Sequence, residues 1–503
     1  MNTQTTINQY PANTLPLLLC DYYKLSHRAQ YPKGTEVVYS TWTPRKSLMP
    51  GINGAVAFGF QSFIQETLVE YFNREFFQRD INEITAEYTR IVKHTLFVEN
   101  VDVSHLEALH KLGYLPIRMK AVPEGTLVPL NTPMLTLENT KPEFFWLTNF
   151  LETMMSSELW QSSTSATISR DYKRILTKFA METNGNADHV PFQAHDFSFR
   201  GMVGIDGATK SGAAHLTSFV GTDTIPAISF LERHYGANVE KELVGTSIPA
   251  TEHSVMCAHG HDERESFRKL IQEIYPAGFV SIVSDTWDFW NVIENVIPSL
   301  KEEILARDGK VVIRPDSGNP VKIIVGDENG ATELERKGLV EALWDIFGGE
   351  VNELGYKVLD PHIGAIYGDS ITRERAEQIL QGLKDKGFAA SNIVFGVGSF
   401  SFQFTTRDSL GFAMKATWTL RSDGEFMIFK APKTDASKNS QRGRVVVFEE
   451  DGEIKFRDGL TLETEAEFVQ TVTPLFQTIF EDGQVQNLTT LNEVRERVTA
   501  SLA

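Results

Sequence analysis

The chain contains 503 residues, too many for one ordinary hydrophobic core, so we expect two or more domains. Apolar residues make up 41% and charged residues 23% of the sequence, as is usual for a globular protein. The formal net charge of −18 argues against a nucleic-acid-binding protein, which would present a basic face. It does not exclude a small anionic substrate, because nearby Arg and Lys outweigh a distant negative field.

The cysteine content and the N-terminal residues indicate the compartment. Cys20 and Cys257 are the only cysteines, so at most one disulfide is possible and a reducing environment is favoured. The first residues show neither a basic start nor an apolar segment, so no signal peptide is predicted. No apolar run approaches the length of a membrane span. These features predict a cytoplasmic protein.

The first 185 residues predict helices together with an antiparallel sheet. We expect an N-terminal helix over 14–27, and the alternation over 36–43 is typical of a strand. Residues 115–138 hold short alternating segments around the turn at Pro123-Glu124-Gly125, which indicates a compact antiparallel unit. Further helices are expected at 60–72, 143–160 and 170–183.

Between about 190 and 400 the pattern changes to short apolar strands that end in polar residues, with helices between the later strands, such as an amphipathic helix over 375–384. The clearest example is Val311–Ile313, which is followed by Arg314 and Asp316 on a Gly/Pro-rich turn. A strand fixes the origin of the loop that follows it, which is how α/β enzymes present a site. Taken alone, the same turn is equally consistent with a surface loop that carries one ion pair.

Six further segments share this pattern, and together they predict the fold class. They are 194–201, 221–224, 247–254, 279–285, 365–369 and 393–399. Parallel strands that close into a right-handed barrel would bring all these ends to one face, and an open doubly wound sheet is the alternative. Neither a G-x-G-x-x-G fingerprint nor a P-loop is present.

Antiparallel signals return after Arg407. The clearest hairpin of the chain spans 444–456, and a helix is expected over 489–502. We therefore predict an α/β barrel domain over 186–400. Residues 1–185 with 401–503 should form a discontinuous α+β domain with antiparallel strands.

The residues at the predicted strand ends fall into four chemical groups. The groups that suit phosphate oxygens are Arg200, His253, Arg314, Arg407 and Lys415. Gly368 and Gly398 allow a phosphate to approach backbone N–H groups. The carboxylates that suit sugar hydroxyls or Mg²⁺ are Asp285, Asp316 and Asp369. Tyr23 and Phe197 could hold a flat ring between them, so the whole set predicts a phosphorylated sugar with a planar base.

Structural explanations for single members of this set remain open. Gly368-Asp369 could be a simple turn, Asp285 a helix N-cap and His253 a core histidine. The cluster at 259–262, HGHD, lacks the cysteines and the helical His spacing of zinc sites. We interpret that cluster as a solvated loop and a helix cap.

Nine short motifs run in order along nearly the whole chain. They are DYYK at 21–24, AVPEG at 121–125, HDFSFRG at 195–201, GTDT at 221–224, PATEHS at 249–254, SDTWD at 284–288, IRPDSGNP at 313–320, YGDS at 367–370 and TRD at 406–408. Together they resemble the nicotinate/nicotinamide phosphoribosyltransferase family, and within it the bacterial form that acts on nicotinamide. Each motif is weak alone, but nine in the family's order are highly specific.

The resemblance implies a reaction and a fold. Nicotinamide and phosphoribosyl pyrophosphate would give nicotinamide mononucleotide and pyrophosphate, in the salvage of NAD. The fold would be the irregular α/β barrel of type II phosphoribosyltransferases beside an α+β domain with an antiparallel sheet. The resemblance also implies a homodimer with shared sites, Mg²⁺ bound mainly through substrate phosphates, and ATP as a co-substrate.

The resemblance further implies roles for individual residues. Phe197 and the partner's Tyr23 would clamp the pyridine ring, and Asp223 would accept a hydrogen bond from the carboxamide, aided by Ser281 and Arg314. Arg200, His253 and Arg314 would bind the pyrophosphate, and Asp316 and Asp369 would bind the ribose hydroxyls. The 5′-phosphate would be bound by Gly368, Gly398 and Ser399 together with the partner's Arg407 and the partner's Lys415. Lys430 and Lys438 would lie near the 5′-phosphate. The catalytic set would be His253, Asp285, Arg314 and Asp316, and His253 matches the histidine that the family phosphorylates with ATP.

Three positions depart from the family pattern, and two other functions compete. Gly364 replaces an arginine expected near the phosphates, Ser399 replaces a glycine and Ala413 replaces a serine. The closest alternative is a nicotinate phosphoribosyltransferase, which the carboxylate of Asp223 disfavours because it would repel a nicotinate carboxylate. The other alternative is a non-catalytic barrel that binds a nucleotide without turnover.

Overall fold

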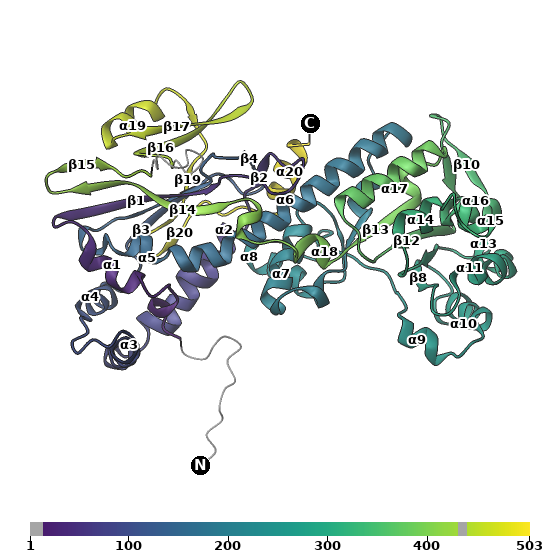
Figure 1. Cartoon of the computed structure of the whole chain (residues 1–503), viewed down its shortest axis with the longest axis horizontal. Coiled ribbons are helices and arrows are strands. Elements are labelled where there is room, and N and C mark those ends of the chain that lie inside the picture. Colours follow the sequence, from purple (N-terminus) through teal and green to yellow (C-terminus); the bar gives the residue numbers. More distant parts are fainter. Residues whose placement is uncertain (1–13, 431–439, 503) are drawn as a thin grey trace, which may run out of the picture.

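The long helix α6 (Glu152–Thr183) lies between two sheets of different kinds (Figure 1). One is a seven-stranded antiparallel sheet, and the other is a six-stranded sheet whose strands all run parallel. The computed structural model describes residues 14–430 and 440–502, so Lys438 lies outside the described residues. Within these ranges, no helix combines the length and the apolar character needed to cross a membrane.

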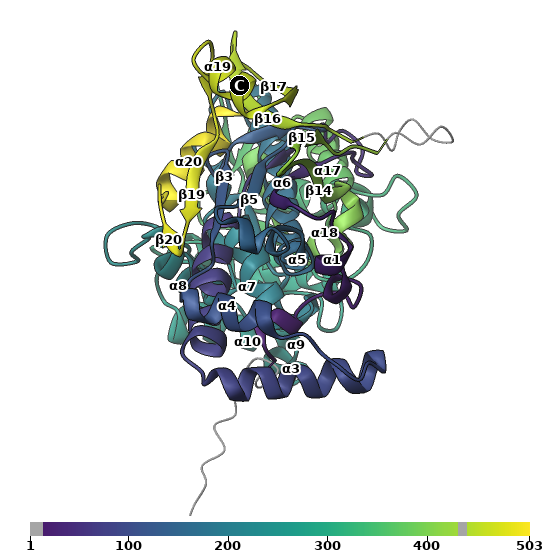
Figure 2. The same cartoon turned by 90° about the vertical axis from the view of Figure 1, so that its left-hand side faces the viewer.

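The antiparallel sheet joins strands from both ends of the chain. In spatial order its strands are β15 (Gly424–Met427), β14 (Phe412–Arg421), β1 (Thr35–Pro44), β5 (Leu135–Asn139), β3 (Ile117–Ala121), β19 (Gln477–Glu481) and β20 (Gln484–Val485). Figure 2 shows β20 and β19 at one edge and β14 and β15 at the other. Trp42 of β1 stacks on Phe412 of β14 with 5.2 Å between ring centroids, in the core of this part. The strand expected at 36–43 and the antiparallel unit expected at 115–138 are confirmed.

The helices cover both sheets. In chain order the helices other than α6 are α1 (Lys24–Gln30), α2 (Phe60–Phe63), α3 (Ile81–Leu96), α4 (Ser104–Leu112), α5 (Leu147–Phe150), α7 (Gly204–His215), α8 (Ile225–Tyr235), α9 (His253–Ala258), α10 (Glu263–Lys269), α11 (Phe289–Asn291), α12 (Ile297–Ser299), α13 (Lys301–Leu305), α14 (Pro320–Val325), α15 (Glu333–Lys337), α16 (Leu339–Phe347), α17 (Arg373–Asp385), α18 (Ser399–Phe402), α19 (Leu462–Val469) and α20 (Leu491–Ala500). The amphipathic helix expected after Arg375 is confirmed as α17, which buries Ile379, Leu380 and Leu383 in the barrel core.

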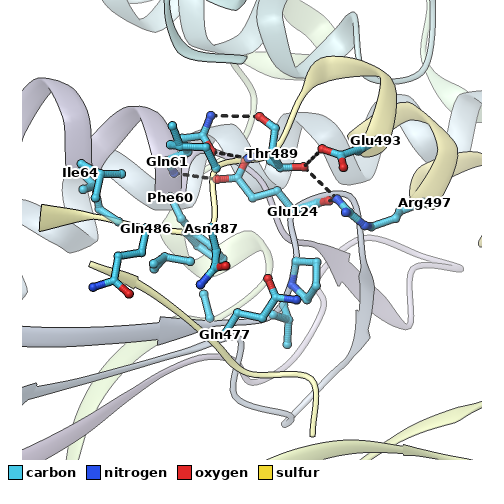
Figure 3. A pocket seen from close by; sticks show the side chains of 16 residues that line it. Phe60, Gln61, Ile64, Glu124, Gln477, Gln486, Asn487, Thr489, Glu493 and Arg497 are labelled. Carbon is cyan, nitrogen blue, oxygen red and sulfur yellow. Dashed lines mark hydrogen bonds between the residues drawn. The ribbon is translucent and has the colours of Figure 1, made fainter. Parts of the chain in front are cut away.

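The C-terminal tail is built into the antiparallel part, and Figure 3 shows the junction. The Oε1 atom of Gln61 accepts a hydrogen bond from the backbone N–H of Thr489 at 2.8 Å, and Arg497 donates to the carbonyl of Glu124 at 2.9 Å. The Glu124 carboxylate accepts the backbone N–H of Gln61 at 2.6 Å and so caps the start of α2. These residues border a cavity of about 220 Å³, in which the hydrogen-bonding groups of Glu124 are satisfied within the protein.

The parallel sheet forms most of a barrel. In spatial order its strands are β7 (Gly221–Thr222), β6 (Ala194–Asp196), β13 (Ile393–Val397), β12 (Ile363–Tyr367), β9 (Val311–Arg314) and β8 (Val280–Val283). The segment 246–251 forms a parallel bridge to Gly221 of one edge strand and another to Ser281 of the other edge strand. The sheet therefore curls until one irregular segment contacts both edges, and the open doubly wound alternative is wrong.

Three small sheets complete the strands. They are β2 (Gly54–Val56) with β4 (Leu127–Pro129), β10 (Gly349–Val351) with β11 (Lys357–Leu359), and β17 (Glu453–Leu460) with β16 (Arg444–Glu450) and β18 (Thr473–Pro474). The pairing of β16 with β17 confirms the hairpin expected over 444–456.

The expected break between two helices and the expected start of the N-terminal helix were wrong. The two helices expected at 143–160 and 170–183 are largely one continuous helix, α6, because the Ser/Thr-rich stretch between them is buried and helical. The hydroxyl of Ser163 donates to the carbonyl of Phe58 at 3.0 Å, and small side chains let the chain near Gly59 approach closely. The N-terminal helix begins only at Lys24, because Leu15 and Leu17 are buried in a short 3₁₀ turn before it.

Candidate active site

The carboxyl ends of the six parallel strands gather the polar residues at one end of the barrel. The backbone N–H of Phe197, just after β6, donates to the carbonyl of Val397 in β13 at 3.0 Å, which ties two ends together. A Cβ on Gly368 would lie 2.9 Å from the Phe197 ring and 3.4 Å from Oδ1 of Asp316. A Cβ on Gly201 would lie 2.3 Å from Oγ of Ser399. Residues from four strand ends are therefore direct neighbours.

A cavity of about 340 Å³ runs from these ends into the barrel interior. Its wall includes Phe197, Asp223, Ser281 and Ile366. A planar ligand ring that contacts Phe197 at the strand ends would therefore extend into this cavity. The hydroxyl of Ser281 is buried and has no hydrogen-bond partner among the described residues. An unpartnered buried hydroxyl is costly, so a polar ligand atom that bonds to it would gain affinity.

Three carboxylates form a second group at the same end. Oδ2 of Asp285 accepts hydrogen bonds from the backbone N–H of Asp316 at 2.8 Å and from the hydroxyl of Ser317 at 2.6 Å. Burial, followed by the negative charges of Asp369, Asp285 and Asp316, raises the pKa of Tyr367 well above its usual range. The three carboxylates therefore lie near enough to one phenol to influence its ionisation, at the end of the barrel where hydroxyl groups of a ligand could bind.

The structure also decides among the alternatives for single residues. Asp285 is not a helix cap, because Asp288 caps α11 by accepting the N–H of Asn291 at 3.1 Å. The side chain of His253 is 47% exposed and its Nε2 lies 3.6 Å from Oδ1 of Asp285, so it is not a core histidine.

The structure also bears on the cluster at 259–262 and on the position of Gly364. Asp262 caps α10 by accepting the N–H of Glu265 at 3.0 Å, as expected for the cluster at 259–262. No group of three His, Cys, Asp or Glu residues in the described part of the chain is arranged to hold a metal ion. Gly364 was expected near the phosphates, but it lies within β12 in the wall of the barrel cavity, four residues before Gly368.

A second cluster of predicted site residues lies on the antiparallel part. A pocket of about 490 Å³ is lined by Tyr23, Lys24, Glu152 and Lys415. Burial, followed by the negative charge of Glu152, raises the pKa of Tyr23, while the positive charge of Arg407 opposes the rise. Figure 1 shows α1 and β14, which carry this cluster, toward the N-terminal end of α6 and away from β8, β12 and β13. Within one chain, the two sets of site residues therefore do not meet.

Two further predicted positions lie on this side. Lys430 is exposed after β15, and its backbone N–H donates to Ser440 at 3.0 Å. Ala413 is buried in β14 opposite Thr43 of β1, so its side chain belongs to the sheet core.

Sequence reasoning missed two residues that contact Asp223. Nε2 of His195 lies 2.8 Å from Oδ1 of Asp223, and the hydroxyl of Ser247 donates to the same oxygen at 2.8 Å. The signal for His195 was present, because it precedes Phe197 by two residues on a strand and therefore shares its face. The signal for Ser247 was absent, since only the closure of the barrel by segment 246–251 brings it there.

Comparisons with known proteins agree with this geometry. The model of the nicotinate phosphoribosyltransferase (NAPRTase) family matches residues 192–484, which include the whole barrel. This chain belongs to the nicotinate phosphoribosyltransferase family. A second model, the N-terminal domain of nicotinamide phosphoribosyltransferase, matches residues 16–119.

Similar members of the family are named for nicotinamide. The chain is 48% identical over 501 residues to a nicotinamide phosphoribosyltransferase of Acinetobacter baylyi, with 97% of each chain covered. It is 33% identical to a protein of the same name from Xanthomonas campestris, which covers 96% of this chain and 98% of that protein.

Solved structures support the fold of the family. A nicotinate-nucleotide pyrophosphorylase from Pyrococcus furiosus matches 100% of this chain and 98% of its own, with a TM-score of 0.58 at 15% identity. Human nicotinic acid phosphoribosyltransferase matches 95% of this chain and 92% of its own, with a TM-score of 0.51 at 17% identity. The predicted fold class, an α/β barrel of the type II phosphoribosyltransferase kind beside an antiparallel domain, is confirmed.

Proposed function

We propose that this protein transfers a phosphoribosyl group from phosphoribosyl pyrophosphate to nicotinamide, giving nicotinamide mononucleotide and pyrophosphate in the cytoplasm. The observation that carries the proposal is the cavity of about 340 Å³ that Phe197, Asp223 and Ser281 line, in which the Ser281 hydroxyl has no hydrogen-bond partner within the described part of the chain. The names of the relatives from Acinetobacter baylyi and Xanthomonas campestris support it.

The polar groups of the cavity suit a carboxamide better than a carboxylate. Oδ2 of Asp223 receives no hydrogen bond from the described residues, so it is free to accept one from the carboxamide N–H. The hydroxyl of Ser281 can donate to the carboxamide oxygen, and Arg314 lies near enough to lower the pKa of Asp223. A nicotinate carboxylate would face the ionised Asp223, so the alternative substrate, nicotinate, is disfavoured.

We further propose that two copies of the chain share each site. Phe197 supplies one face of the ring clamp, and the second face would come from the partner's Tyr23, because Tyr23 of the same chain directly precedes α1, which Figure 1 shows far from β8, β12 and β13. Exposed apolar side chains follow Arg200 and Ser399 closely along the chain, as expected of an interface. They are Val203 at 76%, Ile205 at 66%, Phe400 at 49% and Phe404 at 75% exposure.

The remaining predicted residues suit the phosphates and the ribose. Arg200, His253 and Arg314 would hold the pyrophosphate, and Asp316 and Asp369 the ribose hydroxyls. The groups proposed for the 5′-phosphate are Gly368, Gly398 and Ser399, with Arg407, Lys415 and Lys430 arriving from the partner. A Cβ on Gly398 would meet no atom within 4 Å, so the backbone there is open to a ligand.

The buried Oδ1 of Asp285 has no hydrogen-bond partner among the described residues, which fits a nearby cation. We propose that Mg²⁺ arrives on the substrate phosphates, where the carboxylates of Asp285 and Asp316 would hold it. When bound, Mg²⁺ would neutralise charge that develops on the leaving pyrophosphate.

The chemistry requires positioning more than proton transfer. The bond between C1 of the ribose and the pyrophosphate oxygen breaks, and the ring nitrogen of nicotinamide forms the new bond to C1. Charge collects on the leaving pyrophosphate, where each well-placed donor such as Arg200 or Arg314 stabilises it by about 3–4 kcal/mol. The ring nitrogen carries no proton, so no general base is needed, and Phe197 and Asp223 orient that nitrogen toward C1.

We propose ATP as a co-substrate that phosphorylates His253. The imidazole is 47% exposed, so a nucleotide can reach it. Its Nδ1 lies 3.3 Å from the hydroxyl of Thr286 and its Nε2 lies 3.6 Å from Asp285, and these contacts orient the ring.

A product assay tests the proposed function. The purified protein is incubated with Mg²⁺, phosphoribosyl pyrophosphate and either nicotinamide or nicotinate, and the mononucleotide and pyrophosphate are measured. We expect turnover with nicotinamide and a strong preference for it, which Asp223→Asn should reduce because its side chain no longer repels a carboxylate. Equal rates with both substrates would contradict the amide selectivity, and binding without pyrophosphate release would favour a nucleotide sensor.

A further inference from the structure

The carboxylate of Asp223 is held through one oxygen only. His195 and Ser247 both reach Oδ1, at 2.8 Å each, whereas Oδ2 receives no hydrogen bond from the described residues. The side chain of His195 is 12% exposed and that of Asp223 is 49% exposed. One oxygen is therefore anchored to the barrel wall, and the other is left to accept a hydrogen bond from a ligand in the cavity that Asp223 lines.

The strands set this geometry. His195 and Gly221 are paired across β6 and β7, and a Cβ on Gly221 would come within 2.8 Å of Nδ1 of His195, so the glycine makes room for the imidazole. The rings of His195 in β6 and of Phe197 directly after β6 are 4.9 Å apart. The backbone N–H of Asp223 donates to the carbonyl of Asp196 at 3.0 Å. His195 thus links the ring-binding side chain to the amide-binding side chain.

The surroundings of Asp223 keep it ionised. Burial alone would raise its pKa, but the hydrogen bond and charge of His195, the hydroxyl of Ser247 and the charge of Arg314 outweigh burial, and the pKa is lowered. A carboxylate only accepts hydrogen bonds, so Nε2 of His195 carries the proton in this contact. The other titratable groups on the elements packed around it are His189, Asp196, His215 and Lys310.

We propose that His195 is a positioning residue that makes Asp223 selective for nicotinamide over nicotinate. This inference rests on the proposed function. By holding Oδ1, His195 points Oδ2 at the carboxamide N–H. By favouring the ionised form, it also maintains the negative charge that repels a nicotinate carboxylate.

Two replacements of His195 separate positioning from simple packing. His195→Leu removes the donor, whereas His195→Gln keeps an N–H donor at about the same reach. We expect His195→Leu to raise KM for nicotinamide by about tenfold or more, with a smaller change in kcat, because hydrogen bonds to charged groups are strong. His195→Gln should restore most of that loss, and Ser247→Ala should raise KM by about threefold, since a second donor to Oδ1 remains.

The pH profile provides a readout that packing does not change. Without the donor, burial dominates and the pKa of Asp223 rises, so the acid limb of kcat/KM for nicotinamide should move to higher pH in His195→Leu. The ratio of nicotinate to nicotinamide turnover should rise at the same time, because a protonated Asp223 no longer repels nicotinate.

The outcomes are distinct for the two proposals. No product from nicotinamide with the wild type would reject the proposed function itself. Normal wild-type turnover with an unchanged acid limb and substrate ratio in His195→Leu would reject the role of His195 alone. If His195→Leu fails to fold, as its melting temperature would reveal, the ratio of nicotinate to nicotinamide turnover is measured in Ser247→Ala and His195→Gln instead. Equal KM values for wild type and Ser247→Ala would then overturn the proposal.

Discussion

The ring of Phe197 lies directly over Gly396, where a Cβ would come within 2.3 Å of Cδ2 of the ring. Gly396 has an ordinary strand backbone in β13, so the glycine is required by the ring and not by the chain conformation. We predict that Gly396→Ala displaces Phe197 and raises KM for nicotinamide by about tenfold, since a stacked aromatic face is worth about 1–3 kcal/mol. Steady-state kinetics with nicotinamide as the varied substrate measure this.

The control for this prediction is a double-mutant cycle. The added methyl would also approach Cα of Gly368 at 2.6 Å, so we expect Gly396→Ala to lower the melting temperature as well. Phe197→Leu should reproduce the rise in KM, and adding Gly396→Ala to it should change KM no further. Gly207→Ala on α7, where a methyl meets only Gln161 at 3.4 Å, should leave KM unchanged. Independent, additive effects of the two site substitutions would contradict the contact.

The shared site predicts a specific pattern of complementation. Phe197→Ala damages the barrel half of each site, and Tyr23→Ala damages the half supplied by the partner. In a mixed dimer one site carries both changes and the other carries neither, so equal mixing should restore about a quarter of wild-type activity if pairing is random. Activity of the equal mixture measures this, and heterodimers purified from it through two different tags should show about half of wild-type activity, because one of their two sites is intact.

A second pair of variants provides the control. Tyr23 and Arg407 lie on the same part of the chain, so Tyr23→Ala mixed with Arg407→Ala should restore nothing. In every mixed dimer of that pair, each site lacks one of the two side chains. Recovery in both mixtures, or in neither, would contradict sites shared in the proposed way.

The position of His253 predicts where ATP acts. Incubation of the wild type with ATP labelled in its terminal phosphate should label the protein, and His253→Ala should abolish the label. His259→Ala is the matched control, because His259 is also exposed and ends the same helix. ATP should also lower KM for phosphoribosyl pyrophosphate in the wild type but not in His253→Ala. A label retained by His253→Ala would place the phosphate elsewhere.

Local sequence patterns were enough to predict the residues at the strand ends. Val311–Ile313 followed by Arg314 and Asp316 forms β9 and its tip, as the run of β-branched residues before a Gly/Pro turn indicates. The apolar positions of α17 were readable for the same reason, since helical periodicity is local.

Local sequence patterns could not predict contacts between segments that are distant in the chain. In the barrel β6 lies beside β13, about two hundred residues later, so no local signal links Phe197 to Gly396. The buried hydroxyl-rich stretch of α6 resembled a break between two helices, because its helical state depends on tertiary contacts such as that of Ser163 with Phe58. Ser247 reaches Asp223 only because its segment closes the barrel.

The buried pair of Arg444 and Glu138 in the antiparallel part gives the last prediction. Their atoms Nη1 and Oε2 are 2.7 Å apart, and the two side chains are 4% and 9% exposed. We expect Glu138→Gln to reduce the free energy of unfolding by about 3 kcal/mol, because among the described residues it leaves the buried guanidinium with Glu465 as its remaining ionised partner. Glu450→Gln, which breaks an exposed pair with Lys455, should cost less than about 1 kcal/mol.

The pH dependence of this loss distinguishes a charge effect from a packing effect. Burial would raise the pKa of Glu138, but the charge and hydrogen bond of Arg444 outweigh it and the pKa is lowered. A lowered folded pKa stabilises the protein above the unfolded value of about 4.3, and that stabilisation disappears as the pH falls through the folded value. Urea unfolding at pH 7 and at pH 4 should therefore show the difference between wild type and Glu138→Gln shrinking at the lower pH. A difference that stays constant would mean that shape, and not charge, accounts for the stabilisation.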